Sequence, residues 1–440
     1  MGMMTGVRRA LLSGGQAAAV PVTYLLNAPF TAADQGYANA QVLDTVAEGI
    51  TAGQLTVVEV DGTLAVVSNK CAFTAQVTPV WGDQDFYSQA ITRALGRGLL
   101  ATVNLSVLGA GSWYGFADST ASTSYSRISS AAFFMYNIGF CYVIDTGASP
   151  IVGSVPAIGV DYNFAVVLGG YDVNGVPWRS GEAAASYLYG STIFLKGGAY
   201  LSWTRLWSHS TEATTPVYAM VGLYDPGGAI DAFRVPDVDL SATLQPNNLS
   251  LFAAAGELDA YTPEVGGGWT ENTGDWDTAG GVLQATAAGI ATFTGLADCV
   301  YDVKVTLPAA GVAPGGLILR GSDFAGANDD YWYAKITPGT AGTDFQLIEV
   351  NAGVETVRAS ADVDWTAATA YNVRVIVQGS TWWKAYVNGV EKLIYTTANV
   401  FNQAATSCGL LDEGNANFTF DNVALFARTA AVYDATLDAV

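Results

Sequence analysis

The chain has 440 residues, of which 50% are hydrophobic and 13% are charged, and its formal net charge is −21. This much apolar sequence excludes a disordered chain, and one hydrophobic core rarely extends over such a length, so we expect two or three domains. The 18 basic residues are scattered among 39 acidic ones. This argues against nucleic acid as a partner, because clustered Lys and Arg bind a phosphate backbone.

Residues 1–24 are predicted to form an N-terminal arm. Two arginines precede apolar residues there, as in a secretory signal, but the polar sequence SGGQ at 13–16 interrupts the apolar run. No membrane span is expected either. Residues 99–117 carry no charge, but polar side chains and glycines break this run and favour buried strands.

Short alternating runs separated by turn residues follow the arm. Such runs predict strands at 55–60, 64–67, 71–77, 102–108, 131–144, 162–168, 193–195, 200–207, 217–223 and 230–235. No stretch of ten or more residues shows a clean helical period with caps. The first half is therefore predicted to be all-β.

Residues 236–248, PDVDLSATLQPNN, are polar and have a proline near each end, which is typical of a connector. With it, the chain is divided into an arm (1–24), a first β-sandwich (25–240), a linker (241–248), a second β-sandwich (249–428) and a C-terminal tail (429–440).

The second half contains the clearest strand pattern. Valines alternate with other residues over 371–378, and a second alternating run ends at Asn388-Gly389. An Asn-Gly pair between two alternating runs is a strong hairpin signal. Residues 418–426 supply a closing strand. Antiparallel strands of this kind expose one apolar face, so they are expected to pack against a second sheet as a sandwich.

The two halves repeat one plan. Their entry, middle and exit segments occur in the same order, and an Asn-Gly pair follows each middle strand. The matched segments are 53–64 with 268–276, 162–167 with 371–376, Asn174-Gly175 with Asn388-Gly389, and 228–235 with 418–425. A repeat of this kind predicts two copies of one structural unit.

The second half also carries a set of motifs: GGWT at 267–270, GDW at 274–276, GLILR at 316–320, DYWY at 330–333, YNVRV at 371–375, VNG at 387–389 and FDNV at 420–423. This set resembles the concanavalin A-like, or laminin G-like, jelly-roll superfamily over residues 250–428. The first half matches less well, most clearly at FLKGG (194–198) and WTRLW (203–207). Tandem modules of this style are similar to those of bacteriophage virion proteins, such as tail, fibre or capsid-decorating proteins.

Three patterns resemble parts of catalytic sites. Asp145-Thr146-Gly147 follows an apolar run, as in aspartic proteases, but is interpreted as a turn after a strand. His209 is the only histidine and is interpreted as an exposed turn residue. Glu349 and Glu355 flank an expected hairpin at 351–353, and they do not form the carboxylate pair of a glycosidase. We therefore expect no enzyme activity and no required cofactor.

Calcium is considered as a ligand of the loop at 322–330. Asp323, Asn328, Asp329 and Asp330 supply the hard oxygen atoms that calcium prefers. Laminin G-like domains often bind calcium at a rim loop, so the resemblance implies the same site. The alternative is a solvated turn between two strands.

Five tryptophans could form a platform on which a sugar ring stacks: Trp81, Trp113, Trp332, Trp382 and Trp383. Adjacent residues of a strand point to opposite faces, so one of the rings of Trp382 and Trp383 is expected to lie outside the sandwich. The alternative role of these rings is packing in the core.

Four cysteines, Cys71, Cys141, Cys299 and Cys408, form no C-x-x-C pair, which argues against a zinc site. They could form one disulfide in each half or remain buried thiols. We favour buried thiols, because a large core does not need covalent cross-links.

The sequence thus predicts a non-enzymatic structural protein of a bacteriophage virion. The arm would contact other virion proteins, the chain would form a homo-oligomer, and the sandwiches would contact host surface glycans. No membrane or nucleic acid is expected as a partner. The alternative is an extracellular, calcium-dependent carbohydrate-binding protein.

Overall fold

The structure is a computed structural model, and it describes residues 24–28, 55–59, 63–68, 70–75, 84–106, 111–117, 131–136, 140–145, 147–150, 157–210, 217–224, 226–307, 313–324, 326, 328–339, 342–414 and 418–440. In several strands, including those between 131 and 150, only the backbone is described. The described elements are almost all antiparallel strands, which confirms the predicted fold class.

The first half forms two facing sheets. Their strands are β1 (Tyr24–Ala28), β2 (Leu55–Glu59), β3 (Thr63–Val67), β4 (Lys70–Ala75), β5 (Gln84–Ser88), β6 (Gly98–Leu105), β7 (Gly111–Ala117), β8 (Ala131–Tyr136), β9 (Phe140–Asp145), β10 (Gly147–Pro150), β11 (Asp161–Tyr171), β12 (Tyr189–Gly197), β13 (Tyr200–His209), β14 (Tyr218–Tyr224) and β15 (Gly228–Pro236). One sheet has the order β13-β12-β11-β6-β15-β4-β3, with β1 also paired to β15, and the other has the order β10-β9-β8-β7-β14-β5-β2.

The second half is one sheet folded over on itself. Its strands are β16 (Asn248–Ser250), β17 (Gly256–Glu257), β18 (Trp269–Ala279), β19 (Val282–Thr294), β20 (Cys299–Thr306), β21 (Gly315–Asp323), β22 (Asp330–Ile336), β23 (Phe345–Asn351), β24 (Val354–Ala361), β25 (Ala370–Gln378), β26 (Trp382–Val387), β27 (Val390–Tyr395), β28 (Ser407–Asp412) and β29 (Thr419–Ala427). The first residues of β19 pair with β29 and its last residues pair with β28, so β19 joins the two layers.

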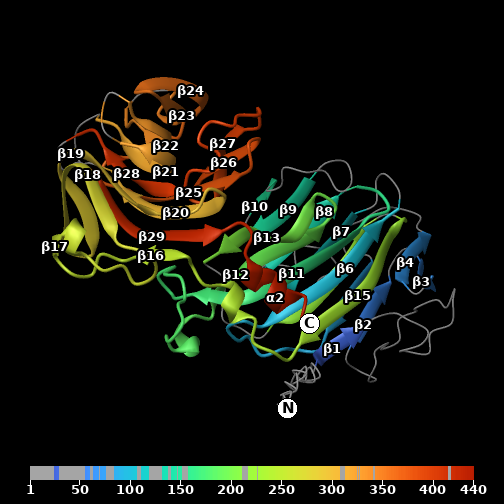
Figure 1. Cartoon of the computed structure of the whole chain (residues 1–440). Coiled ribbons are helices and arrows are strands. Elements are labelled where there is room, and N and C mark those ends of the chain that lie inside the picture. The colour runs from blue at the N-terminus through green and yellow to red at the C-terminus, as the bar shows by residue number, and fades with distance from the viewer. Residues whose placement is uncertain are drawn as a thin grey trace, which may run out of the picture.

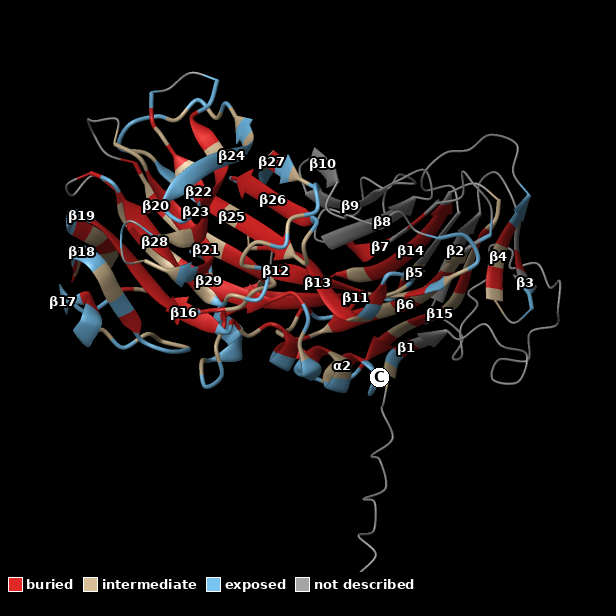
Figure 2. Cartoon of the chain, turned by 45° about the horizontal axis from the view of Figure 1, so that its top comes forward, coloured by how far each residue is buried: buried red, intermediate tan, exposed pale blue. Residues whose placement is uncertain are grey.

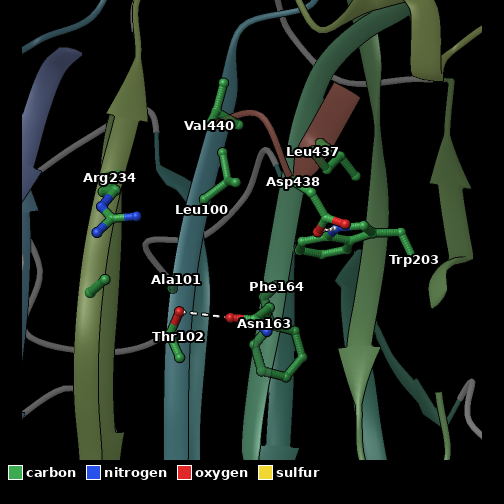
Figure 3. A pocket seen from close by; sticks show the side chains of 11 residues that line it. Leu100, Ala101, Thr102, Asn163, Phe164, Trp203, Arg234, Leu437, Asp438 and Val440 are labelled. Carbon is green, nitrogen blue, oxygen red and sulfur yellow. Dashed lines mark hydrogen bonds between the residues drawn. The ribbon is translucent and has the colours of Figure 1, made fainter. Parts of the chain in front are cut away.

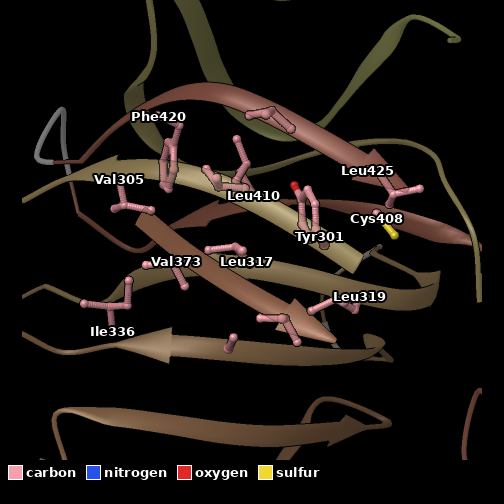
Figure 4. Close-up of a cluster of buried hydrophobic side chains, with 14 of the residues drawn as sticks. Tyr301, Val305, Leu317, Leu319, Ile336, Val373, Cys408, Leu410, Phe420 and Leu425 are labelled. Carbon is pink, nitrogen blue, oxygen red and sulfur yellow. The ribbon is translucent and has the colours of Figure 1, made fainter. Parts of the chain in front are cut away.

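Period-2 alternation explains why this sheet closes around a core. On β20, Tyr301, Val303 and Val305 point inward and are buried with residues of the facing layer, including Leu317 and Leu319 (Figure 4). Complete burial of each aliphatic side chain contributes about 1.5–3 kcal/mol to folding. The core is therefore built by alternate residues, and the other alternate residues form an outer face.

The two sandwiches have the same strand topology. In strand order, β6 to β10 correspond to β20 to β24, β11 to β13 correspond to β25 to β27, and β14 and β15 correspond to β28 and β29. The long strands β18 and β19 occupy the places of the shorter pairs β2–β3 and β4–β5. Figure 1 shows the two units side by side. The two copies predicted from the repeat are thus present in the fold.

One of the matched segments was assigned incorrectly. Asn388-Gly389 is the turn between β26 and β27, whereas Asn174-Gly175 lies between β11 and β12, which is a different connection. The equivalent turn of the first sandwich is Gly197-Gly198, between β12 and β13. Both turns require positive φ, with values of +49° and +79° at Asn388 and Gly389. The dipeptide was misleading because Asn-Gly serves more than one kind of turn.

The connector and the C-terminal tail both pack on the first sandwich. A short 3₁₀ turn, η3 (Ser241–Thr243), and the C-terminal helix α2 (Ala431–Leu437) cover the outer face of β11, β12 and β13 (Figure 1). Leu240, Leu244, Tyr433 and Leu437 are buried there, and Figure 2 shows α2 buried on one side and exposed on the other.

The second sandwich covers the free end of β13 with the outer face of its own sheet. The residues of that face nearest the contact are apolar, and they join the core of the first sandwich in one cluster: Val300, Ile376, Trp382, Tyr386, Ala424 and Phe426. Sheet faces that bury such side chains against a neighbour associate through the hydrophobic effect. The junction is therefore a continuation of the first core and not a loose contact between two domains.

Two buried arginines cross this junction. Arg428 donates hydrogen bonds to the carbonyl oxygens of Arg205 and Leu206 on β13 and to Oε1 of Gln378 at 2.8 Å. The guanidinium of Arg205 lies 3.9 Å from the ring centroid of Phe426, and that of Arg428 lies 5.0 Å from the ring of Trp382. Burial lowers the pKa of Arg428 to about 10.

Among the described residues, no helix combines the length and the apolar character needed to cross a membrane. Cys299 and Cys408 are buried thiols, as predicted, and Cys71 is also buried. The side chain of Cys141 lies outside the described residues.

We predict that Arg428→Ala lowers the free energy of unfolding by about 3 kcal/mol, because it leaves buried carbonyl groups and Gln378 without their donor. Arg428→Lys should lower the free energy of unfolding by about 2 kcal/mol, since an ammonium group cannot reproduce the planar array of N–H donors of a guanidinium. Urea denaturation measures both. The control is Lys70→Ala, which removes an exposed ion pair with Asp161 at 2.7 Å and should cost less than about 1 kcal/mol. Equal losses for Arg428→Ala and Lys70→Ala would contradict this account of the junction.

Candidate functional site

The outer face of the second sandwich changes from apolar to polar along its strands. On β20, Val300 is followed on the same face by Asp302 and Lys304. On the antiparallel β25, Ile376 is preceded on that face by Arg374 and Asn372. The apolar end is buried against the first sandwich, whereas the polar end faces an open space between the two sandwiches. This space is a cleft of about 670 Å³.

The opposite wall comes from the first sandwich. Tyr171 ends β11, Trp207 and His209 end β13, and the turn at 173–177 forms the rim. Oδ1 of Asp172 accepts hydrogen bonds from the backbone N–H groups of Asn174 and Val176, both at 2.8 Å, which orders that turn. The wall is therefore built on strand ends and a hydrogen-bonded turn.

Glycine allows Tyr171 to approach β13 closely. Gly190 has φ of +74°, and a Cβ atom there would lie 2.0 Å from the carbonyl oxygen of His209 and 2.7 Å from Cδ2 of Tyr171. No other residue fits this position without displacing one of them. The ring of Tyr171 is thereby placed beside the end of β13.

Aromatic rings line the cleft where the two walls meet. The ring of Trp207 lies 4.7 Å from that of Tyr386, at an interplanar angle of 65°. The guanidinium of Arg374 lies 4.6 Å from the ring centroid of Trp207. Tyr171 and Tyr189 add two more rings from the first sandwich. The cleft thus combines apolar ring surfaces with polar groups, which is typical of small-molecule sites.

The charges of the second wall are paired with one another. Nε and Nη2 of Arg374 donate to the two oxygens of Asp302, at 2.6 and 2.8 Å, and Nη1 donates to the carbonyl of Ser208 at 2.8 Å. Burial alone would lower the pKa of Arg374, but the charge of Asp302 outweighs it and holds that pKa above its ordinary value. Nζ of Lys304 lies 3.4 Å from Asp421. The wall therefore presents ion pairs, not a net charge.

The hydroxyl of Tyr171 and Nε1–H of Trp207 lie in the cleft and are buried without a hydrogen-bond partner. The two residues are only 4% and 6% exposed. A buried donor without a partner costs about 1–3 kcal/mol, so each such group in a folded protein needs an explanation. A ligand in the cleft would supply the missing acceptors.

Three of the five tryptophans predicted to form a sugar platform are described with their side chains, and these three do not form one. Trp332 and Trp383 stack on each other inside the second core, with ring centroids 4.5 Å apart, and both are fully buried. Trp382 does point to the opposite face, as expected, but the first sandwich covers that face. The prediction is wrong for these three rings, because Trp332 and Trp383 fill the inner core and the first sandwich covers Trp382. Trp81 and the side chain of Trp113 lie outside the described residues.

The acidic loop does not gather its side chains around a common point. Asp323 and Asp330 face each other at the ends of β21 and β22, and Oδ1 of Asp330 accepts from the backbone N–H of Ala352 at 2.7 Å. Asp329 accepts from the backbone N–H of Gly326, and Asn328 is exposed. Burial and the charges of Asp323 and Asp330 raise the pKa of Asp329.

Within the described parts of the chain, no three His, Cys, Asp or Glu side chains are arranged to hold a metal ion. The geometry of the loop therefore favours the alternative that the sequence left open, a turn in which carboxylates cap backbone N–H groups. Calcium binding at this loop stays a prediction.

His209 is the residue whose surroundings differ most from the expectation. It was predicted to be an exposed turn residue, but it is the last residue of β13 and only 5% exposed. Its ring lies 6.1 Å from that of Trp207, at the cleft. The polar sequence around it, SHSTE at 208–212, was misleading because the second sandwich covers the end of β13.

The other catalytic patterns keep their structural interpretation. Asp145 ends β9 and pairs with Gly147, the first residue of β10, so these two residues lie at the reversal between two strands. Glu349 forms an ion pair with Arg358 at 2.8 Å, and Glu355 forms one with Lys335 at 3.1 Å. These carboxylates are thus paired with cations and not with each other.

Sequence reasoning named several cleft residues without recognising their role. Asn372, Arg374, Asn388, Gly389 and Asn422 belong to the motifs that indicated the fold, and all of them line the cleft. The available signal was their polarity at outward positions of strands whose other outward positions are apolar. Only the docking of the first sandwich shows that these outward positions face a partner wall.

A smaller cavity, of about 180 Å³, lies between the C-terminal helix and the first sandwich (Figure 3). Its polar side chains bond to one another: Thr102 donates to Oδ1 of Asn163 at 2.8 Å, and Nε1 of Trp203 donates to Asp438 at 2.9 Å. The volume is below the roughly 300 Å³ at which ligand pockets begin. The larger cleft is therefore the better candidate site.

No protein-family model and no curated protein matches the chain. Among solved structures it is similar to the carbohydrate-binding module CBM66 from Bacillus subtilis, with 18% identity over 36% of this chain and 95% of that chain, and a TM-score of 0.30. For sheep galectin-11 the identity is 10% over 32% of this chain and 98% of that chain, and the TM-score is 0.25. For a GH43 protein from Bacillus licheniformis the identity is 10% over 68% of this chain and 72% of that chain, and the TM-score is 0.31. At TM-scores of 0.31 or less, these likenesses carry no conclusion about this chain.

Proposed function

We propose that this chain is a non-enzymatic saccharide-binding protein whose site is the cleft between the two sandwiches. The observation that carries the proposal is the pair of buried, unpartnered donors on Tyr171 and Trp207, in a cleft lined by aromatic rings. A sugar ring offers apolar C–H faces to aromatic side chains and hydroxyl oxygens to donors.

The ligand that fits best is a neutral saccharide. The charged groups on the second wall already form ion pairs, and an anionic ligand would have to disrupt them. The net charge of −21 also repels anions at long range. Asn174, Asn372, Asn388 and Asn422 supply amide groups, which both donate and accept hydrogen bonds and therefore suit hydroxyl groups.

The same wall supports binding without hydrolysis. Asp302 is the one carboxylate among the residues that line the described cleft, and both of its oxygens accept hydrogen bonds from Arg374. Glycoside hydrolysis ordinarily uses two carboxyl groups, one as an acid and one as a base or nucleophile. We therefore propose that the bound sugar is released unchanged.

We predict that Tyr171→Phe weakens saccharide binding about tenfold, because the ligand loses one donor. The same change should leave the midpoint of thermal unfolding unchanged or raise it, since the free protein loses an unpartnered buried hydroxyl. Isothermal titration with neutral tetrasaccharides of glucose, galactose, mannose and xylose measures affinity, and calorimetric scanning measures stability. The measurement is repeated with a chelator, and affinity should not change.

The matched control is Tyr333→Phe. The hydroxyl of Tyr333 is also buried without a partner, but it lies on the other layer of the second sandwich and does not line the cleft. This variant should show the same small effect on stability and no change in affinity. If the wild-type chain binds none of the saccharides, or if Tyr171→Phe binds them as tightly as Tyr333→Phe does, the cleft is not a saccharide site.

A second candidate function is a structural component of a bacteriophage virion that contacts host glycans. The observation that supports it is the buried, hydrogen-bonded junction between two equivalent sandwiches, which suits a structural component. In this proposal the chain is a homo-oligomer located in the virion, and residues 1–20 attach it to other virion proteins.

Deletion of residues 1–20 tests the attachment. We expect the truncated chain to fold, as judged by an unchanged circular dichroism spectrum, and to be absent from purified particles. Incorporation of the truncated chain at the wild-type level would rule out the arm as the anchor.

A further inference from the structure

We propose that the C-terminal segment, residues 428–440, is a latch that sets the distance between the two walls of the cleft. This inference rests on the proposed function, since it concerns the control of the same site. The latch consists of the buried Arg428, the bridge residue Thr429 and the helix α2. It leaves the second sandwich at the end of β29 and binds the first sandwich along β13.

The strand β13 connects the latch with the cleft. Near its start, Trp203 contacts α2; in its middle, Thr204 pairs with Thr429 and Arg205 bonds to Arg428; at its end, Trp207 and His209 form a wall of the cleft. The backbone N–H of Arg205 donates to the carbonyl of Arg428 at 2.8 Å. One continuous strand thus runs from the contacts of the latch to the wall of the cleft.

The helix α2 is held to the first sandwich on one face. Tyr433 and Leu437 are each 2% exposed, and the ring of Tyr433 lies 5.0 Å from that of Phe194. Oδ1 of Asp434 accepts from the backbone N–H of Trp203 at 2.9 Å, and Asp438 forms an ion pair with Lys196 at 2.7 Å. The opposite face carries Val432, which is 42% exposed.

Without the latch, the second sandwich would be held to the first by the connector, by the apolar contact on the end of β13 and by the hydrogen bond from Arg374 to the carbonyl oxygen of Ser208. In the connector, Asn247 donates to the carbonyl of Leu425 at 2.7 Å and accepts from the N–H of Ala427 at 2.8 Å. The latch adds a further attachment along β13, which opposes rotation of one sandwich against the other. Because the ligand contacts both walls, rotation would separate the groups that bind it.

The test uses the full chain with Tyr433→Ala and Leu437→Ala combined. We expect this variant to bind the tetrasaccharide that the wild type binds at least tenfold more weakly, and its radius of gyration in small-angle X-ray scattering to increase. Val432→Ala, on the exposed face of the same helix, is the matched control and should change neither quantity. A variant with Tyr433→Phe in place of Tyr433→Ala keeps the ring, and it should regain most of the affinity that the double variant loses.

An unchanged affinity in the double variant would overturn the proposal, whether or not the radius of gyration increases. A weaker affinity with an unchanged radius would also overturn it, because the latch would then not act through the distance between the walls. The scattering measurement needs no ligand. If the wild type binds no saccharide, the proposed function fails, while an expansion of the double variant still shows that residues 428–440 hold the two sandwiches together.

Discussion

The architecture depends on one constraint, which is the need to bury the outer face of the second sandwich's sheet. Alternate residues of β20, β25, β26 and β29 fill the inner core, and the intervening apolar residues would remain in water if that sandwich stood alone. The first sandwich covers them with the end of β13. Arg205 and Arg428 can be buried at this contact because backbone carbonyl groups and aromatic rings surround them.

The cleft is a consequence of the same contact. The covered face is apolar at one end of its strands and polar at the other, so the first sandwich can pack closely against only part of it. Asn372, Arg374 and Asn388 remain at the polar end, opposite Tyr171 and Trp207. The site therefore belongs to neither sandwich alone. It exists because two copies of one fold meet at an angle that leaves their polar surfaces apart.

The repeated unit uses its equivalent surfaces differently in the two halves. In the first sandwich, η3 and α2 cover the outer face of β11, β12 and β13; in the second, the first sandwich itself covers the corresponding face. Each copy would expose an apolar face in isolation, and each is completed by a segment that is distant in sequence. This explains why the connector, which was predicted to be a polar linker, and the C-terminal tail are packed and partly buried.

The sequence alone determined the all-β class, the repeat and most strands, because alternation of apolar residues and turn dipeptides are local signals. It also showed outward polar residues such as Asn372 and Arg374, but these cannot be distinguished from solvated positions by their neighbours in the chain. Only the tertiary structure decided that Trp382 is covered, that His209 is buried and that Tyr171 faces Arg374 across a cleft. The reason is physical: burial at these positions depends on a surface contributed by residues more than a hundred positions away, and no local pattern encodes how two sandwiches dock.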